Sequence, residues 1–98
     1  MTLDDLLYDI HALENEIRSY ERKFGMLSEL FYEAYANGEE PEDDVWVRDW
    51  TAWAGLYQLW LERRLQYKAA INALQRVEQT FSQVMERTAR HEPIPVPA

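Results

Sequence analysis

The sequence predicts an all-α protein, a long helical hairpin with a short helix at its turn. Two rows of apolar residues, one in each half of the chain, step by three or four, as in amphipathic helices and not in strands. Between the rows, Asn37-Gly38 and a loop containing Pro41 supply turn signals. Ninety-eight residues without cysteine amount to one domain that has no disulfides.

The first helix is predicted over residues 2–24. Thr2 is a suitable N-cap, and Asp4 and Asp5 match the positive end of the helix dipole. Gly25 predicts the end of this helix, although a glycine inside a helix costs only about 1 kcal/mol, so a kinked continuation stays open. The apolar row of this helix consists of Leu3, Leu6, Ile10, Leu13, Ile17, Tyr20, Phe24 and Leu27.

A short second helix is predicted over residues 28–36. Ser28 is its expected N-cap, and Asn37-Gly38 is a good signal for its C-terminus. The acidic stretch 39–44 follows as a solvated loop, in which Asp43 or Asp44 can cap the next helix.

The longest helix is predicted over residues 45–90, because its apolar register continues to Met85 and no proline occurs before Pro93. Its first half carries a row of rings at spacings of 4, 3, 4 and 3. These are Trp46, Trp50, Trp53, Tyr57 and Trp60. Residues 1–90 are thus expected to form a single helical domain, followed by a flexible, proline-rich tail at 91–98 whose deletion leaves the helices intact.

The charge distribution favours the hairpin and limits the partners. Residues 1–44 hold thirteen acids and three bases, whereas residues 62–90 hold six bases and three acids, so the two halves attract. A net charge of −8 argues against nucleic-acid binding by this chain alone. With no signal-peptide pattern and no run of 18 apolar residues, we expect a cytoplasmic protein that does not bind membranes.

No arrangement of residues indicates catalysis. His11 and His91 lie far apart in the sequence, without a nucleophile or metal-ligand set at useful spacing. The acidic loop lacks the ligand pattern of an EF-hand, and no paired Glu-x-x-His motifs occur. The sequence therefore predicts no enzyme, no cofactor and no metal site.

Protein binding is the remaining function class. Trp and Tyr dominate interface energetics, which makes the five rings of the long helix candidate partner-binding residues. Packing in a core is the favoured explanation for most of these rings, ahead of a ligand-binding cage. In the tail, Ile94 and Val96 alternate with proline and are further candidates for docking into a partner. Two apolar faces in so short a chain also predict a homo-oligomer, a dimeric helical bundle or coiled coil.

Two stretches resemble short all-helical prokaryotic proteins that are encoded beside small toxins and regarded as antitoxins. Residues 20–32 resemble the pattern Tyr-Glu-x-Lys-aromatic-Gly-Met-Ser-Ser-x-x-Phe, with Leu27 in place of the usual Ser, and Gly38-Glu39 follows. Residues 49–57 resemble Asp-aromatic-x-x-Trp-x-x-Leu-Tyr, with Ala52 where an acid is common. The resemblance implies a protein that neutralises a toxin by binding and masking it, without a reaction of its own. The alternative is a self-associating structural adaptor that has no toxin partner.

Overall fold

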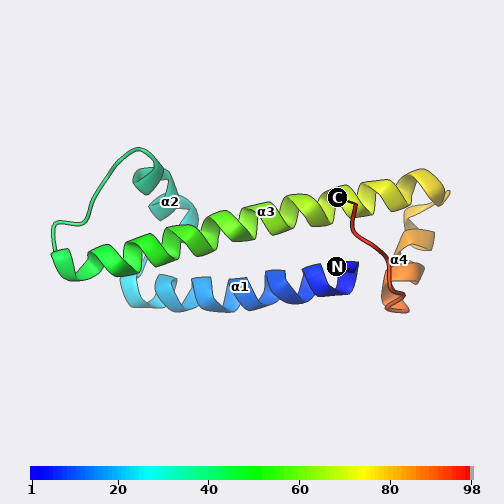
Figure 1. Ribbon diagram of the computed structural model, residues 1–98, viewed down its shortest axis with the longest axis horizontal. Coiled ribbons are helices and arrows are strands. Elements are labelled where there is room, and N and C mark those ends of the chain that lie inside the picture. The colour runs from blue at the N-terminus through cyan, green and yellow to red at the C-terminus, as the bar shows by residue number, and fades with distance from the viewer. Residues whose placement is uncertain (98) are drawn as a thin grey trace. The chain divides into compact units, whose positions relative to one another are not determined.

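The computed structural model describes residues 1–97, so Ala98, the end of the predicted tail, lies outside the described residues. Within them the architecture is all-helical, as predicted, and α1 and α3 form a helical hairpin (Figure 1). The elements are α1 (Leu3–Phe24), α2 (Ser28–Ala36), the 3₁₀ turn η1 (Asp44–Trp46), α3 (Val47–Val77) and α4 (Phe81–Ala89).

The chain divides into two compact units, each with its own core. The terminal unit consists of Met1–Ile10 and the described residues from Glu62 onward. The aromatic unit is His11–Leu61. Helices α1 and α3 contribute to both units, whereas α2 belongs to the aromatic unit and α4 to the terminal unit.

Helix α1 begins where its sequence predicts. The Thr2 hydroxyl accepts a hydrogen bond from the Asp5 N–H (3.3 Å), and the Asp5 carboxylate accepts one from the Thr2 N–H (2.9 Å). This reciprocal pair satisfies two backbone donors that the first helical turn leaves free. The bonds from Thr2, led by that from its backbone N–H, lower the pKa of Asp5 below its ordinary value.

Gly25 ends α1 rather than kinking it. Its φ of +64° lies in the left-handed region, and the N–H groups of Gly25 and Met26 both donate to the Glu21 carbonyl (2.8 and 3.3 Å). The expected N-cap role of Ser28 is wrong, because Leu27 occupies the cap position and Ser28 is the first residue of α2. The Ser28 N–H instead donates to the Glu21 carboxylate at 2.8 Å, so α1 supplies the acceptor that the cap does not.

Two glycine substitutions form a matched test of this corner. Gly25→Ala is expected to lower the free energy of unfolding by about 1 kcal/mol, because its positive φ strains any L side chain. Gly55→Ala, inside α3 with nothing within 4 Å of the added Cβ, is expected to raise it by up to about 1 kcal/mol. Urea unfolding followed by circular dichroism measures both. Equal effects of the two substitutions would contradict a left-handed corner at Gly25.

The predicted continuous helix 45–90 is wrong near residue 78, because α3 ends at Val77 and α4 begins at Phe81. Thr80 and Gln83 form a capping box, in which the Thr80 hydroxyl accepts from the Gln83 N–H (3.2 Å) and the Gln83 side chain accepts from the Thr80 N–H (3.1 Å). The N-terminal end of the long helix also differs slightly from the predicted start at residue 45. Asp43 caps η1 by accepting from the Val45 N–H at 3.0 Å, and α3 follows from Val47.

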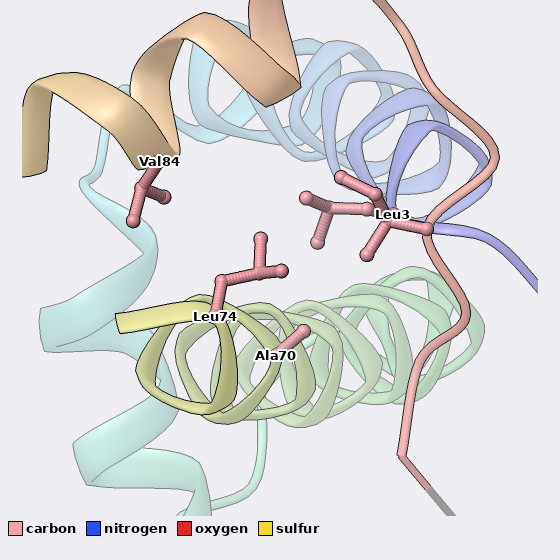
Figure 2. Packing of buried hydrophobic residues seen from close by; sticks show 5 residues of the cluster. Leu3, Ala70, Leu74 and Val84 are labelled. Atoms are coloured by element: carbon pink, nitrogen blue, oxygen red, sulfur yellow. The ribbon is translucent and has the colours of Figure 1, made fainter. Parts of the chain in front are cut away.

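The core of the terminal unit joins α1, α3, α4 and the C-terminal segment. Its buried members are Leu3, Ala70, Leu74, Val84 and Ile94. Figure 2 shows the labelled side chains of Leu3, Ala70, Leu74 and Val84 gathered around one apolar interior. An ion pair between Asp9 and Arg63 (3.8 Å) also joins α1 to α3 in this unit.

We call residues 92–96 the C-terminal strap. The prediction of a flexible tail is wrong for this segment, because it packs against the terminal unit. Ile94 is only 5% exposed, its carbonyl accepts from the Leu3 N–H (2.8 Å), and the Val96 N–H donates to the Met1 carbonyl (3.2 Å). Figure 1 shows this segment, in red, passing the N-terminus. Hydrogen bonds from Arg90 and Arg87 hold Glu92 in place and lower the pKa of its carboxyl group. The apolar side chain of Ile94 completes the core, and this favours the packed conformation.

Candidate functional site

Trp53 is the centre of the aromatic unit. It is 1% exposed and its ring lies parallel to that of Phe31, with the centroids 3.8 Å apart. The rings of Phe24 and Tyr20 also lie nearly parallel to it, at 5.5 and 6.1 Å. Since these rings come from α1, α2 and α3, stacking on Trp53 joins all three helices of the unit.

Ser28 fixes the polar edge of Trp53. The Trp53 indole N–H donates to the Ser28 hydroxyl oxygen at 2.8 Å, and Ser28 is 2% exposed. A buried indole needs such an acceptor, because an unpaired N–H costs about 1–3 kcal/mol. The position of Ser28 at the start of α2, together with its bond to Glu21, therefore fixes α2 against both other helices.

Trp46 and Trp50 extend the ring cluster toward the surface. Trp50 meets Phe31 edge to face at 5.3 Å, and Trp46 meets Phe24 edge to face at 5.1 Å. Trp46 remains 43% exposed. The row predicted on the long helix therefore passes from a buried ring to an open one within two helical turns.

An apolar groove of about 480 Å³ lies over these rings, and we call it the aromatic groove. Met26, Leu30 and Trp46 line it although each is between 43% and 56% exposed. Its other lining residues are Lys23, Phe24, Phe31, Ala34, Glu39, Trp50 and Trp53. Apolar side chains that remain exposed beside a well-packed cluster are typical of a binding surface.

The margin of the aromatic groove is acidic. Lys23, the one base among the lining residues, forms an ion pair with Asp49 and lies 5.6 Å from the centroid of the Phe24 ring. Glu39 lines the groove and opens a loop that carries four more acids before Trp46, namely Glu40, Glu42, Asp43 and Asp44. The whole aromatic unit holds eleven acids and four bases, so its field attracts positive charge.

The structure divides the predicted partner-binding residues into three places. Trp46, Trp50 and Trp53 line the aromatic groove, whereas Tyr57 and Trp60 line a second pocket of the same unit. Ile94 and Val96 belong to the terminal unit, where Ile94 is buried in the core and Val96 is half-buried.

Sequence reasoning did not select Met26 and Leu30 as groove residues. Leu30 lies in α2 and Met26 just before it, and their exposure to solvent depends on how α2 packs on Trp53. The one available signal was that Leu27, Leu30 and Phe31 make α2 and its N-cap more apolar than one buried face requires.

The described residues contain no group of three His, Cys, Asp or Glu side chains placed to hold a metal ion. His11 is exposed, and His91 lies 3.1 Å from the Asp4 carboxylate in the terminal unit. No helix among residues 1–97 has the length and apolar character needed to cross a bilayer.

No family model, curated protein or solved structure matches this chain. Its function is therefore inferred from the geometry and charge of its own surface.

Proposed function

We propose that this chain is a protein-binding module that neutralises a partner toxin by binding and masking it. The observation that carries the proposal is the aromatic groove, where Met26, Leu30 and Trp46 present apolar surface over a fixed ring cluster. Packing on Trp53 holds the floor of the groove, so a partner does not have to order it. Preorganised aromatic and aliphatic anchors are what give small interfaces their affinity.

Charge selects the class of partner. The groove has Glu39 at its margin and four further acids in the adjoining loop, while its only lining base is neutralised by Asp49. A partner segment that carries an apolar anchor flanked by Lys or Arg is complementary to this surface. Toxins that cleave nucleic acids need a basic substrate groove, and an acidic protein bound there excludes the substrate without any reaction.

Capture with matched variants tests the groove. The tagged chain is incubated with a lysate of its own host, and the proteins that co-elute in stoichiometric amount are identified by mass spectrometry. Leu30→Glu places a charge in the groove at a residue 56% exposed, so we expect a basic partner to be lost while the fold is kept. Leu65→Glu, at a residue 67% exposed in the terminal unit, is the matched control and is expected to retain the partner.

Salt dependence is the second readout of the same experiment. Binding that relies on the acidic margin weakens as the Debye length falls from about 10 Å at 0.1 M salt to about 3 Å at 1 M. A partner that is acidic, that resists 1 M salt, or that is lost equally from Leu30→Glu and Leu65→Glu would contradict the proposed site.

Self-association is the second candidate function, and a different surface favours it. Phe81 and Met85 are spaced by four residues along α4, so they share one face of that helix, and each is more than 50% exposed. A structural adaptor would use this apolar pair for contact with a second copy. If so, sedimentation equilibrium will show a dimer that Phe81→Glu converts to monomer. A monomer at micromolar concentration for the unmodified chain would exclude this candidate.

A further inference from the structure

The break between α3 and α4 spans residues 78–80, which we call the hinge. The Gln83 side chain accepts hydrogen bonds from the N–H groups of Gln79 (2.9 Å) and Thr80 (3.1 Å), and the Thr80 hydroxyl accepts one from the Gln83 N–H (3.2 Å). In an uninterrupted helix, the carbonyls of residues 75 and 76 would accept the first two of these bonds. Two side chains therefore replace helical hydrogen bonds that the break removes.

The sequence around the hinge also permits a straight helix. Residues 56–92 contain no glycine or proline, and the apolar register of α3 continues into α4. With the hinge straight, the backbone N–H groups now held by Gln83 would donate to carbonyls of the preceding turn. The same stretch is therefore compatible with two backbone states, a bent one held by the cap and a straight one held by helical hydrogen bonds.

Three apolar side chains around the hinge are open to solvent in the bent state. Val77, Phe81 and Met85 are 74%, 55% and 53% exposed. The break separates Val77 from the other two, but in a straight helix the four-residue spacing places all three on one face. A second copy carries the same face, and two such faces can cover each other about a twofold axis.

A straight hinge also withdraws α4 and the C-terminal strap from the core of their own terminal unit. Val84 and Ile94 are 1% and 5% exposed in that core. The buried side chains around them are Leu3, Ala70 and Leu74, which would be left without cover. The α4 and strap of a second copy have the side chains that fit this space, so an exchange between two copies restores the contacts of the bent state.

We propose that two copies of this chain exchange α4 and the C-terminal strap. In the exchanged dimer the hinge is helical, α3 and α4 form one helix, and α4 of each copy completes the terminal core of the other. The exposed face around the hinge is buried between the copies. This inference does not depend on toxin binding, because the aromatic groove belongs to the other unit. It also differs from self-association through Phe81 and Met85 alone, in which the hinge stays bent.

An engineered disulfide distinguishes exchange from surface contact. Thr2 and Pro95 form an antiparallel bridge flanked by two backbone hydrogen bonds, a geometry in which the Cα atoms are about 4.5 Å apart and a disulfide can form. The chain has no cysteine, so Thr2→Cys with Pro95→Cys supplies the only pair. A concentrated sample is separated by size-exclusion chromatography and oxidised. We expect the dimer fraction to run as a covalent dimer on a denaturing gel and the monomer fraction as a monomer.

Two hinge variants test the straightening. Thr80→Ala with Gln83→Ala removes both capping side chains at exposed positions and introduces good helix formers, so the dimer Kd from sedimentation equilibrium is expected to fall about tenfold. Insertion of two glycines between Gln79 and Thr80 is the control. It lengthens the hinge and opposes a straight helix, but it keeps Phe81 and Met85 on one face of α4. We expect this variant to be monomeric, with the circular dichroism of the unmodified chain.

Three results would overturn the exchange. The first is a dimer fraction whose disulfide links Thr2→Cys and Pro95→Cys within one copy. The second is a glycine insertion that dimerises as tightly as the unmodified chain, which would indicate contact through Phe81 and Met85 with the hinge bent. The third is a monomer at every concentration for both the unmodified chain and the Thr80→Ala, Gln83→Ala variant.

Discussion

Trp53→Ala is expected to lower the free energy of unfolding by about 3–5 kcal/mol, the usual cost of removing a large buried ring. The substitution removes the parallel contacts with Phe31, Phe24 and Tyr20, and it leaves the buried Ser28 hydroxyl without its indole donor. Domains of this size have only about 5–15 kcal/mol of total stability, so a large part of it is lost. Urea unfolding followed by circular dichroism at 222 nm measures the change.

Two further substitutions separate the contributions of Trp53. Trp53→Phe keeps a ring but loses the hydrogen bond to Ser28, so we expect a smaller loss, of about 1–3 kcal/mol. Trp46→Ala removes a ring that is 43% exposed and makes one edge contact, with Phe24, and should cost only about 1 kcal/mol. If Trp53→Ala kept full stability but lost a partner, Trp53 would be an interface anchor and its place in the core would be wrong.

Ile94→Ala is expected to cost about 2–4 kcal/mol in the free energy of unfolding, because it opens a cavity among Leu3, Leu74 and Val84. Deletion of residues 92–98 should cost at least as much, since the Leu3 N–H also loses the Ile94 carbonyl. The same urea experiment measures both changes, and hydrogen exchange of the Leu3 amide reports directly on the strap.

Pro97→Ala is the control for the strap, because Pro97 is exposed and follows the packed residues. Its unfolding free energy should stay within about 0.5 kcal/mol of the unmodified chain. Fast exchange of the Leu3 amide, together with unchanged stability of Ile94→Ala, would show that the strap is the free tail that its prolines suggest.

The local signals predicted the first half of the fold well. The apolar row from Leu3 to Phe24, the Thr2 cap and the left-handed Gly25 are features of residues close in the sequence, and each is confirmed. Leu27, the last predicted member of that row, lies outside α1 and is 65% exposed. The break between α3 and α4 also has a signal in neighbouring residues, the capping box of Thr80 and Gln83. It was overlooked because the apolar register continues across it, and periodicity alone does not distinguish one helix from two in the same register.

The packing of the C-terminal strap and the shape of the aromatic groove could not be predicted, because both depend on contacts between residues that are distant in the sequence. Prolines around Ile94 indicate an extended segment, but they do not show whether that segment is free or packed. Its packing depends on contact between Ile94 and the distant residues Leu3 and Leu74. The prediction that most rings of the long helix pack in a core is confirmed for Trp53, which belongs to a buried cluster. Which rings stay open follows from the position of α2, and that depends on the bond between Ser28 and Trp53, for which the sequence carries no separate signal.

The most direct test of the central claim, that this chain neutralises a partner by binding it, is a growth assay with the captured partner. The partner is expressed from an inducible promoter, alone, with the unmodified chain, or with Leu30→Glu. We expect growth arrest with the partner alone, growth restored by the unmodified chain, and arrest again with Leu30→Glu at equal protein level. Normal growth with the partner alone would contradict the antitoxin function, and full rescue by Leu30→Glu would contradict neutralisation through the aromatic groove.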